Sequence, residues 1–390
     1  METLILGWYV LVETGSVLLL TLFASLPYIG TLISPLFGVM GDRIGHRNVL
    51  CGMRAIYTIL AVTLMIFIFA QGLTPVHVFV IAALMGIVRS SDMVMRNALI
   101  GETMPSRLLM GATSLSRATS DSARVMGALA GAGLVAMLGM GPAYVTVASL
   151  YAGSFLLTLR VGRARPPAMP RATGDPARAS ALRSPWRDLR EVGAHVWGKP
   201  HLLAAMYLAF LLNLTAFPLV HGLLPYVAKE IYDADQTVLG YMVASFATGA
   251  MTGAIVVSRF GGVIRPARMM LVFCAMWYVM LLIFAQQQNA VSGITALFLA
   301  GCTQTLCLVP LSTMLLRTAD ENFRGRILGI RSLAVYGLPI GLWISGPLIA
   351  RFGYQITASA YCLIGLAFTA IIAVRWRSHL WRLGAVANRR

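Results

Sequence analysis

The sequence predicts an all-α integral membrane protein built from two halves of six transmembrane helices each. Three observations carry this prediction. Hydrophobic residues make up 58% of the 390 residues and charged residues only 12%, whereas soluble domains have roughly 45–50% apolar and about 25% charged residues. Apolar runs of helix length recur along the whole chain, and basic residues concentrate in alternate loops between those runs.

Eleven apolar runs are each near or above the roughly 20 residues that a helix needs to cross the hydrocarbon core of a bilayer. They cover residues 16–38, 49–70, 76–98, 110–137, 141–161, 201–227, 237–257, 267–285, 291–316, 327–350 and 354–374. Residues 1–13 form a further apolar stub, too short to cross alone, that places Glu2 at membrane depth. We expect this stub to be the second half of a first helix whose beginning is missing, which gives eleven full spans plus a truncated one.

The basic residues indicate the orientation of the chain. One set of loops holds Arg43, Arg47, Arg107, the basic residues between 160 and 199, Arg259, Arg265, Arg268, Arg317, Arg324, Arg326 and the tail, whereas the intervening loops hold only Lys229 and Arg351. Loops rich in Arg and Lys stay in the cytoplasm, so we expect these loops and the C-terminus there. The net charge of +17 therefore reflects topology. Nucleic-acid binding is not expected, because no basic stripe interleaved with stacking aromatic residues occurs in a polar domain.

The runs divide into an N-terminal bundle (1–160), a basic cytoplasmic linker (161–200), a C-terminal bundle (201–375) and a basic tail (376–390). Ser184 and Pro185 open a short amphipathic helix in the linker. Small residues four apart recur in every third helix, at Gly30, Ser34 and Gly38, at Gly127 and Gly131, at Gly249 and Gly253, and at Gly337 and Gly341. This spacing lets helix backbones approach closely and suggests a three-helix unit repeated four times.

Two consecutive apolar runs carry charges at membrane depth, in RSSDMVMR (89–96) and RATSDSAR (117–124). In each segment the Asp is three or four residues from its two Arg neighbours, so the three charges share one helix face. Both segments are equally far from the loop near Pro105. Folding at that loop predicts one cluster of Arg89, Asp92, Arg96, Arg117, Asp121 and Arg124. The cluster holds the two helices together, binds an anionic or polar substrate group, or carries a proton on one Asp; the residues leave these three roles open.

The segment GVMGDRIGHRNVL, residues 38–50, resembles the cytoplasmic loop motif of the major facilitator superfamily. The matching residues are Gly38, Asp42, Arg43, Gly45, Arg47 and Leu50. The glycines permit a tight turn, and Asp42 is placed to cap the positive N-terminal end of a neighbouring helix, which in the family is helix 11. The corresponding loop of the second half, VSRFGGVIRPAR, keeps Arg259 and Gly261 but has Ser258 where an Asp is usual.

Further segments resemble the drug:proton antiporter branch of the superfamily, which includes macrolide and enterobactin-type exporters. They are DLREVGAHVWGKPHLL, LLPYVAKEIY and the FRGRILG run that holds Arg324, Gly325 and Arg326. The resemblance implies the major facilitator fold, in a monomer of the bacterial cytoplasmic (inner) membrane. It also implies export of a small amphiphilic compound by proton antiport through alternating access, with the proton gradient as energy source and no cofactor. The alternatives are a lipid or lysolipid translocator and a transport-inactive membrane sensor or partner protein.

The sequence does not favour an enzyme. It has no phosphate-binding Gly loop, no HExxH and no cluster of metal ligands, and its five cysteines lie in or at the edges of apolar runs without a CxxC spacing. Outside the charged segments, a few polar residues in the later spans are candidates for lining a cavity. They are Asn213 and His221, with Pro218 and Pro225 bending their helix, Gln304, and Arg331 near the cytoplasmic entrance.

Overall fold

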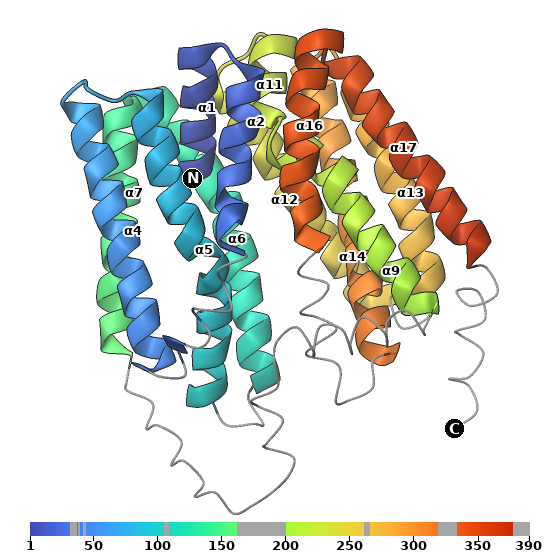
Figure 1. The fold of residues 1–390 in the computed structure, drawn as a ribbon, viewed down its shortest axis with the longest axis horizontal. Coiled ribbons are helices and arrows are strands. Elements are labelled where there is room, and N and C mark those ends of the chain that lie inside the picture. Colours follow the sequence, from blue (N-terminus) through green and yellow to red (C-terminus); the bar gives the residue numbers. More distant parts are fainter. Residues whose placement is uncertain are drawn as a thin grey trace, which may run out of the picture. The chain divides into compact units, whose positions relative to one another are not determined.

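The structure is a computed structural model that describes residues 1–31, 37, 40–41, 44–104, 109–161, 200–260, 266–318 and 334–376. Within the helices, the side chains of Arg117, Asp121 and Arg124 are among those outside the description. All regular secondary structure in the described residues is helical (Figure 1). The prediction of an all-α protein is confirmed.

The helices follow the predicted apolar runs closely. In the first half they are α1 (Glu2–Thr14), α2 (Val17–Ser25), the 3-10 helix η1 (Leu26–Thr31), α4 (His46–Phe69), α5 (Pro75–Thr103), α6 (Leu109–Leu138) and α7 (Met140–Arg160). In the second half they are α9 (Pro200–Leu211), η4 (Leu212–Ala216), α10 (Phe217–His221), α11 (Leu224–Tyr226), η5 (Val227–Ile231), α12 (Gln236–Phe260), α13 (Pro266–Ala285), α14 (Ala290–Thr318), η7 (Ala334–Tyr336), α16 (Gly337–Phe352) and α17 (Tyr354–Arg375). Among the described residues, eight helices are long and apolar enough to cross a membrane.

The run predicted at 201–227 is one apolar span, Leu202–Ile231, but it is not a regular α-helix. Two π-helical segments, η4 and η5, interrupt it, and Pro225 stands in the first turn of α11. Proline removes a backbone donor, and π-helical segments inside α-helices are frequent at functional sites. The expected bend at Pro218 and Pro225 stays a prediction, and the π-helical segments are a feature that these prolines alone do not indicate.

The small residues predicted to bring helices together lie at close backbone contacts. A Cβ atom at Gly30 would collide with the carbonyls of α5, one at Gly249 or Gly253 with those of α14, and one at Gly341 with that of Leu214 in η4. A Cβ at Gly131 would meet the Met1 side chain. In the first half, these contacts pair η1 with α5, and α6 with the start of the chain. In the second half, they pair α12 with α14, and α16 with η4. Each pair of one half has its counterpart in the other, as expected for an internal repeat.

Contacts divide the chain into two units, which we call unit 1 (Met1–Met169 and Gly222–Ala244) and unit 2 (Pro170–His221 and Ser245–Arg390). Residues 222–244 join unit 1 through specific contacts. Gly7 lies against the Pro225 ring and Gly240 against Ala132, and Lys229 donates a hydrogen bond to the Leu11 carbonyl at 3.4 Å. Most of the predicted linker, with its amphipathic helix, falls in residues 162–199, outside the described part of the chain, so the proposed domain boundaries stay predictions.

Candidate functional site

Asp92 of α5 forms an ion pair with Arg54 of α4. The Arg54 Nη2 atom lies 3.0 Å from Oδ1 of Asp92 and 3.2 Å from Oδ2. The two side chains are only 18% and 19% exposed, so the pair is largely shielded. A charge inside a transmembrane helix is costly unless a partner compensates it, and each residue of this pair supplies that compensation to the other.

Sequence reasoning missed Arg54 as a functional candidate. It lies 38 positions from Asp92 in the sequence, and no motif or spacing connects the two. One signal was available: Arg54 is the only charged residue in the apolar run 49–70, and a lone cation in a span requires a partner on another helix.

A second polar site of unit 1 surrounds Glu2 at the start of α1. The Tyr151 hydroxyl of α7 donates a hydrogen bond of 2.6 Å to Oε2 of Glu2, whereas Oε1 is buried and has no hydrogen-bond partner among the described residues. Arg89 of α5 interacts electrostatically with this carboxylate, and its Nη1 atom donates to the Thr3 hydroxyl at 3.1 Å. The sequence places Glu2 at membrane depth, where a charge is costly, and the structure gives its carboxylate a donor and a nearby cation.

The two polar sites are connected through a pair of tyrosines. The rings of Tyr57 on α4 and Tyr151 on α7 stack, with centroids 5.4 Å apart and an interplanar angle of 26°. Tyr57 is buried and stands three residues after Arg54 on the same helix. Carboxylates, guanidinium groups and phenols therefore follow one another from Glu2 to Asp92, a composition suited to binding and passing protons.

The predicted charge cluster is only partly described. Arg89 is exposed and bonded to Thr3, Asp92 pairs with Arg54, and the half-buried Arg96 has a buried Nε atom without a hydrogen-bond partner among the described residues. The side chains of Arg117, Asp121 and Arg124 lie outside the described residues. The joining of α5 and α6 by one cluster thus stays a prediction.

Of the loop motif at residues 38–50, the structure describes mainly the second part, which includes Gly45 and Arg47. Gly38, Asp42 and Arg43 lie outside the described residues, while Gly45 has φ +90°, the conformation that a glycine in a tight turn adopts readily. Arg47 donates to the carbonyls of Leu159 at 2.5 Å and Val161 at 2.6 Å. A cation at the C-terminal carbonyls of a helix is stabilising, so Arg47 caps the end of α7.

The candidates of the second half are dispersed. The half-buried Asn213 in η4 donates to the Ala209 carbonyl at 2.8 Å, and His221 lies edge-on to Phe217, with ring centroids 5.1 Å apart. Gln304 is buried in α14, and Arg259 is exposed near the end of α12. The remaining candidates, Arg324, Gly325, Arg326 and Arg331, lie outside the described residues. The cavity-lining role of these residues stays a prediction.

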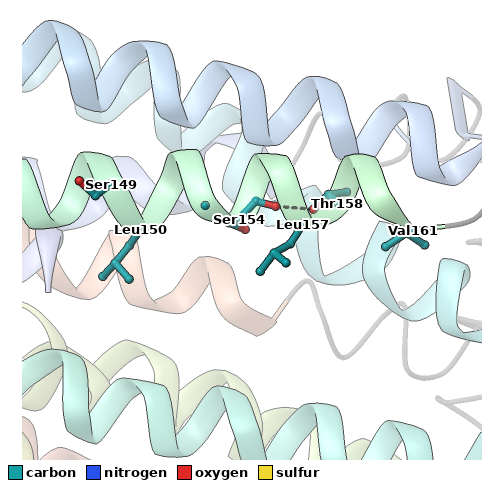
Figure 2. Close-up of a pocket in the computed structure, with 7 residues that line it drawn as sticks. Ser149, Leu150, Ser154, Leu157, Thr158 and Val161 are labelled. Carbon is teal, nitrogen blue, oxygen red and sulfur yellow. Dashed lines mark hydrogen bonds between the residues drawn. The ribbon is translucent and has the colours of Figure 1, made fainter.

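A shallow concavity of about 420 Å³ lies along α7 (Figure 2). Its lining residues all come from that helix or its C-cap: Ser149, Leu150, Gly153, Ser154, Leu157, Thr158 and Val161. The Thr158 hydroxyl is satisfied by the Ser154 carbonyl at 2.7 Å. A surface formed by one helix does not have the convergent polar groups of a substrate site. Within the described residues, no group of three or more His, Cys, Asp or Glu side chains is arranged to hold a metal ion.

Comparison with known proteins gives a family and a fold. The family model described as Major Facilitator Superfamily matches residues 3–344, and no curated protein matches the chain. The crystal structure of a D-xylose-proton symporter is similar, with a TM-score of 0.70 and 13% identity over 95% of this chain and 94% of that chain. The nucleoside transporter NupG is similar with a TM-score of 0.67 and 13% identity over 97% of both chains. At such identities the likeness concerns the fold alone.

Proposed function

The chain belongs to the Major Facilitator Superfamily, and from this premise we propose that it exports a small amphiphilic compound by proton antiport through alternating access. Family membership makes it a transporter rather than an enzyme. The proposal adds three things to that membership: the proton as coupling ion, the outward direction of substrate movement, and the amphiphilic substrate.

The Glu2 carboxylate is the observation that carries proton coupling. The Tyr151 hydroxyl lies 2.6 Å from Oε2 of Glu2 and fixes the orientation of the carboxylate. The other oxygen, Oε1, has no hydrogen-bond partner among the described residues. Ionisable residues within transmembrane segments mark substrate or ion pathways and proton relays. The Arg89 guanidinium interacts electrostatically with this carboxylate, so binding and release of a proton change the local charge.

The direction of transport and the class of substrate rest on the resemblance to drug:proton antiporters. A proton-binding carboxylate serves symport equally well, as one structural neighbour is by name a D-xylose-proton symporter. Export and uptake are therefore separated by an experiment in which only the antiport mechanism gives a fluorescence rise.

The experiment uses everted membrane vesicles containing the full chain, with an acidic lumen reported by a quenched acridine dye. Erythromycin and ethidium, each added outside, serve as probes, and a lysophospholipid tests the alternative of lipid translocation. An antiporter takes the probe in and lets protons out, so fluorescence rises on addition. A symporter moves protons and substrate in the same direction and gives no such rise.

The variant Glu2→Gln keeps the shape of the side chain but cannot ionise, so we expect it to abolish the fluorescence response. The matched control is Glu13→Gln, because Glu13 lies on the same helix but is exposed. A response that survives Glu2→Gln would contradict the proton site, and a response to none of the probes would contradict the proposed substrate class.

A further inference from the structure

Arg89 stands on the buried face of α5 and is nevertheless exposed. The residues that precede it at steps of three and four share its helix face, and all of them are buried: Val78, Ala82 and Met85. The residues on the opposite face are large, apolar and exposed: Val76, Val80 and Leu84. The apolar face is the one suited to lipid, so the exposed Arg89 side chain opens toward the interior of the bundle, where charged residues of membrane proteins line water-filled cavities and substrate routes.

The Arg89 guanidinium keeps most of its donors available. Its Nη1 atom donates to the hydroxyl of Thr3, a neutral acceptor, at 3.1 Å, and no other hydrogen bond or ion pair of Arg89 occurs among the described residues. An arginine carries five N–H donors in a planar fork that fits an oxyanion bidentately. The exposed Thr3 accepts from Arg89 and keeps its own hydroxyl proton, so it can donate to the same oxyanion.

The neighbouring carboxylates leave this fork open. Asp92 is paired with Arg54 at 3.0 Å, and Glu2 interacts with Arg89 electrostatically without forming an ion pair with it among the described contacts. Arg96 adds a further half-buried cation on the same face of α5. Among the described side chains of this region, three arginines thus accompany two carboxylates, and a positive excess attracts anions.

We propose that Arg89, together with the Thr3 hydroxyl, binds an oxyanion of the transported compound: a carboxylate, a sulfonate or a phosphate. The inference rests on the proposed function in that it takes the substrate to be amphiphilic and adds the chemistry of its polar head. Within that class it favours compounds with an anionic head over cationic ones such as ethidium. The guanidinium supplies charge and two parallel hydrogen bonds, which are stronger than bonds between neutral groups.

The competing explanation is that Arg89 only ties α5 to α1 through Thr3. The two explanations differ in one measurable respect: a structural arginine does not make the protein discriminate between amphiphiles by charge, whereas a binding arginine does. The difference is measured on the purified full chain in phosphatidylcholine nanodiscs, with tritiated deoxycholate as the probe in a scintillation proximity assay. The competitors are unlabelled deoxycholate, its neutral methyl ester, lysophosphatidylglycerol and inorganic phosphate.

We expect deoxycholate and lysophosphatidylglycerol to compete at least about tenfold more strongly than the methyl ester. In Arg89→Gln this preference is lost, whereas the control Arg351→Gln keeps it, because Arg351 is an exposed arginine of unit 2 at the end of α16. The stronger of the two anionic competitors identifies the source of the oxyanion, a carboxylate or a lipid phosphate, and either supports the inference.

A second measurement needs no variant. Phenylglyoxal modifies accessible arginines, and mass spectrometry reports the modification at each position. We expect deoxycholate to slow the modification of Arg89 severalfold and to leave that of Arg351 unchanged. Should Arg89→Gln fail to fold, this protection of the wild-type residue still decides.

The inference is overturned by equal competition from deoxycholate and its methyl ester, by a preference that survives Arg89→Gln, by the absence of deoxycholate binding, or by an unprotected Arg89. Inorganic phosphate that competes as well as deoxycholate would also overturn it, because the site would then take a free anion. The assay uses no proton gradient, so its failure leaves the role of Glu2 in the proposed function intact. Loss of the fluorescence response to every probe would contradict export without affecting binding at Arg89.

Discussion

Replacing Asp92 with Asn tests which arginine neutralises this carboxylate. Removing one partner of a fully buried ion pair costs about 3–5 kcal/mol, whereas exposed pairs contribute about 0–1 kcal/mol. With Arg54 and Asp92 18% and 19% exposed, the pair lies nearer the buried limit. The residual exposure reduces the cost expected for a fully buried pair, so we expect Asp92→Asn to lower the free energy of unfolding by about 2 kcal/mol.

A double-mutant cycle isolates the pair from other effects of each substitution. The four proteins are the wild type, Asp92→Asn, Arg54→Gln and the double variant, each unfolded in mixed micelles with increasing SDS while helix content is followed by circular dichroism. The 3.0 Å contact predicts a coupling energy of about 1–2 kcal/mol, since residues in direct contact couple by about 0.5–3 kcal/mol. Parallel cycles with Arg89→Gln and Arg96→Gln provide the comparison.

A cycle with Arg54 that is additive within about 0.5 kcal/mol would refute the pairing. If the cycle with Arg96 then gave the larger coupling energy, Asp92 would interact mainly with an arginine of its own helix, as the spacing in RSSDMVMR allows. The expected order of coupling energies is Arg54 first, with Arg89 and Arg96 both smaller, because Arg54 is the partner within 4 Å among the described residues.

Three further substitutions test the packing and the site. Gly341→Ala places a methyl group against the Leu214 carbonyl and should destabilise the protein by about 1–3 kcal/mol in the same SDS titration, whereas Gly133→Ala, in open space on α6, should not. Arg47→Gln removes the charged donor from the end of α7, so hydrogen exchange of the last turn of α7, measured by mass spectrometry, should accelerate severalfold; unchanged exchange would contradict the cap. Tyr151→Phe removes the hydroxyl that donates to Glu2 and should weaken the fluorescence response of the vesicles without loss of stability beyond about 1 kcal/mol; an unchanged response would contradict a role of this hydrogen bond in proton coupling.

The helices and the family could be predicted because both are encoded locally. A run of apolar residues of span length has few alternatives to a membrane helix, and the four pairs of small residues indicate backbone contacts through their spacing alone. The loop motif at residues 38–50 names the superfamily, and the match over residues 3–344 confirms it. The antiporter branch was not confirmed in the same way, because substrate and direction depend on side chains that the family model does not distinguish.

The polar site could be predicted only in part because it depends on the register between helices. Sequence spacing places Arg89 and Asp92 on one face of α5, but it does not tell which neighbouring helix that face meets. The charge pattern predicted partners for Asp92 in the next charged segment along the chain, whereas Asp92 pairs with Arg54 on the preceding helix. Glu2 was missed as a site because its hydrogen bond comes from Tyr151, 149 positions away.

The internal repeat allows the charged positions of unit 1 to be compared with unit 2. Gly86 on α5 and Gly301 on α14 are equivalent, because a Cβ atom on either would collide with a backbone carbonyl of the helix packed against it. Three residues beyond these glycines stand Arg89 in the first half and the buried Gln304 in the second. The guanidinium near Glu2 thus has a neutral amide as its counterpart.

Six residues beyond the same two glycines stand Asp92 and Cys307. The helix preceding α14, α13, supplies a partner to Cys307 as α4 does to Asp92, since the thiols of the free cysteines Cys307 and Cys274 are hydrogen-bonded, and both residues are fully buried. The same helix contact therefore forms with a neutral pair in unit 2 and with the Arg54–Asp92 ion pair in unit 1. A buried ion pair is often no more stabilising than well-packed neutral residues, so packing alone does not explain why the charges are present in unit 1. The Arg54–Asp92 pair therefore places two charges at a helix contact whose packing does not require them.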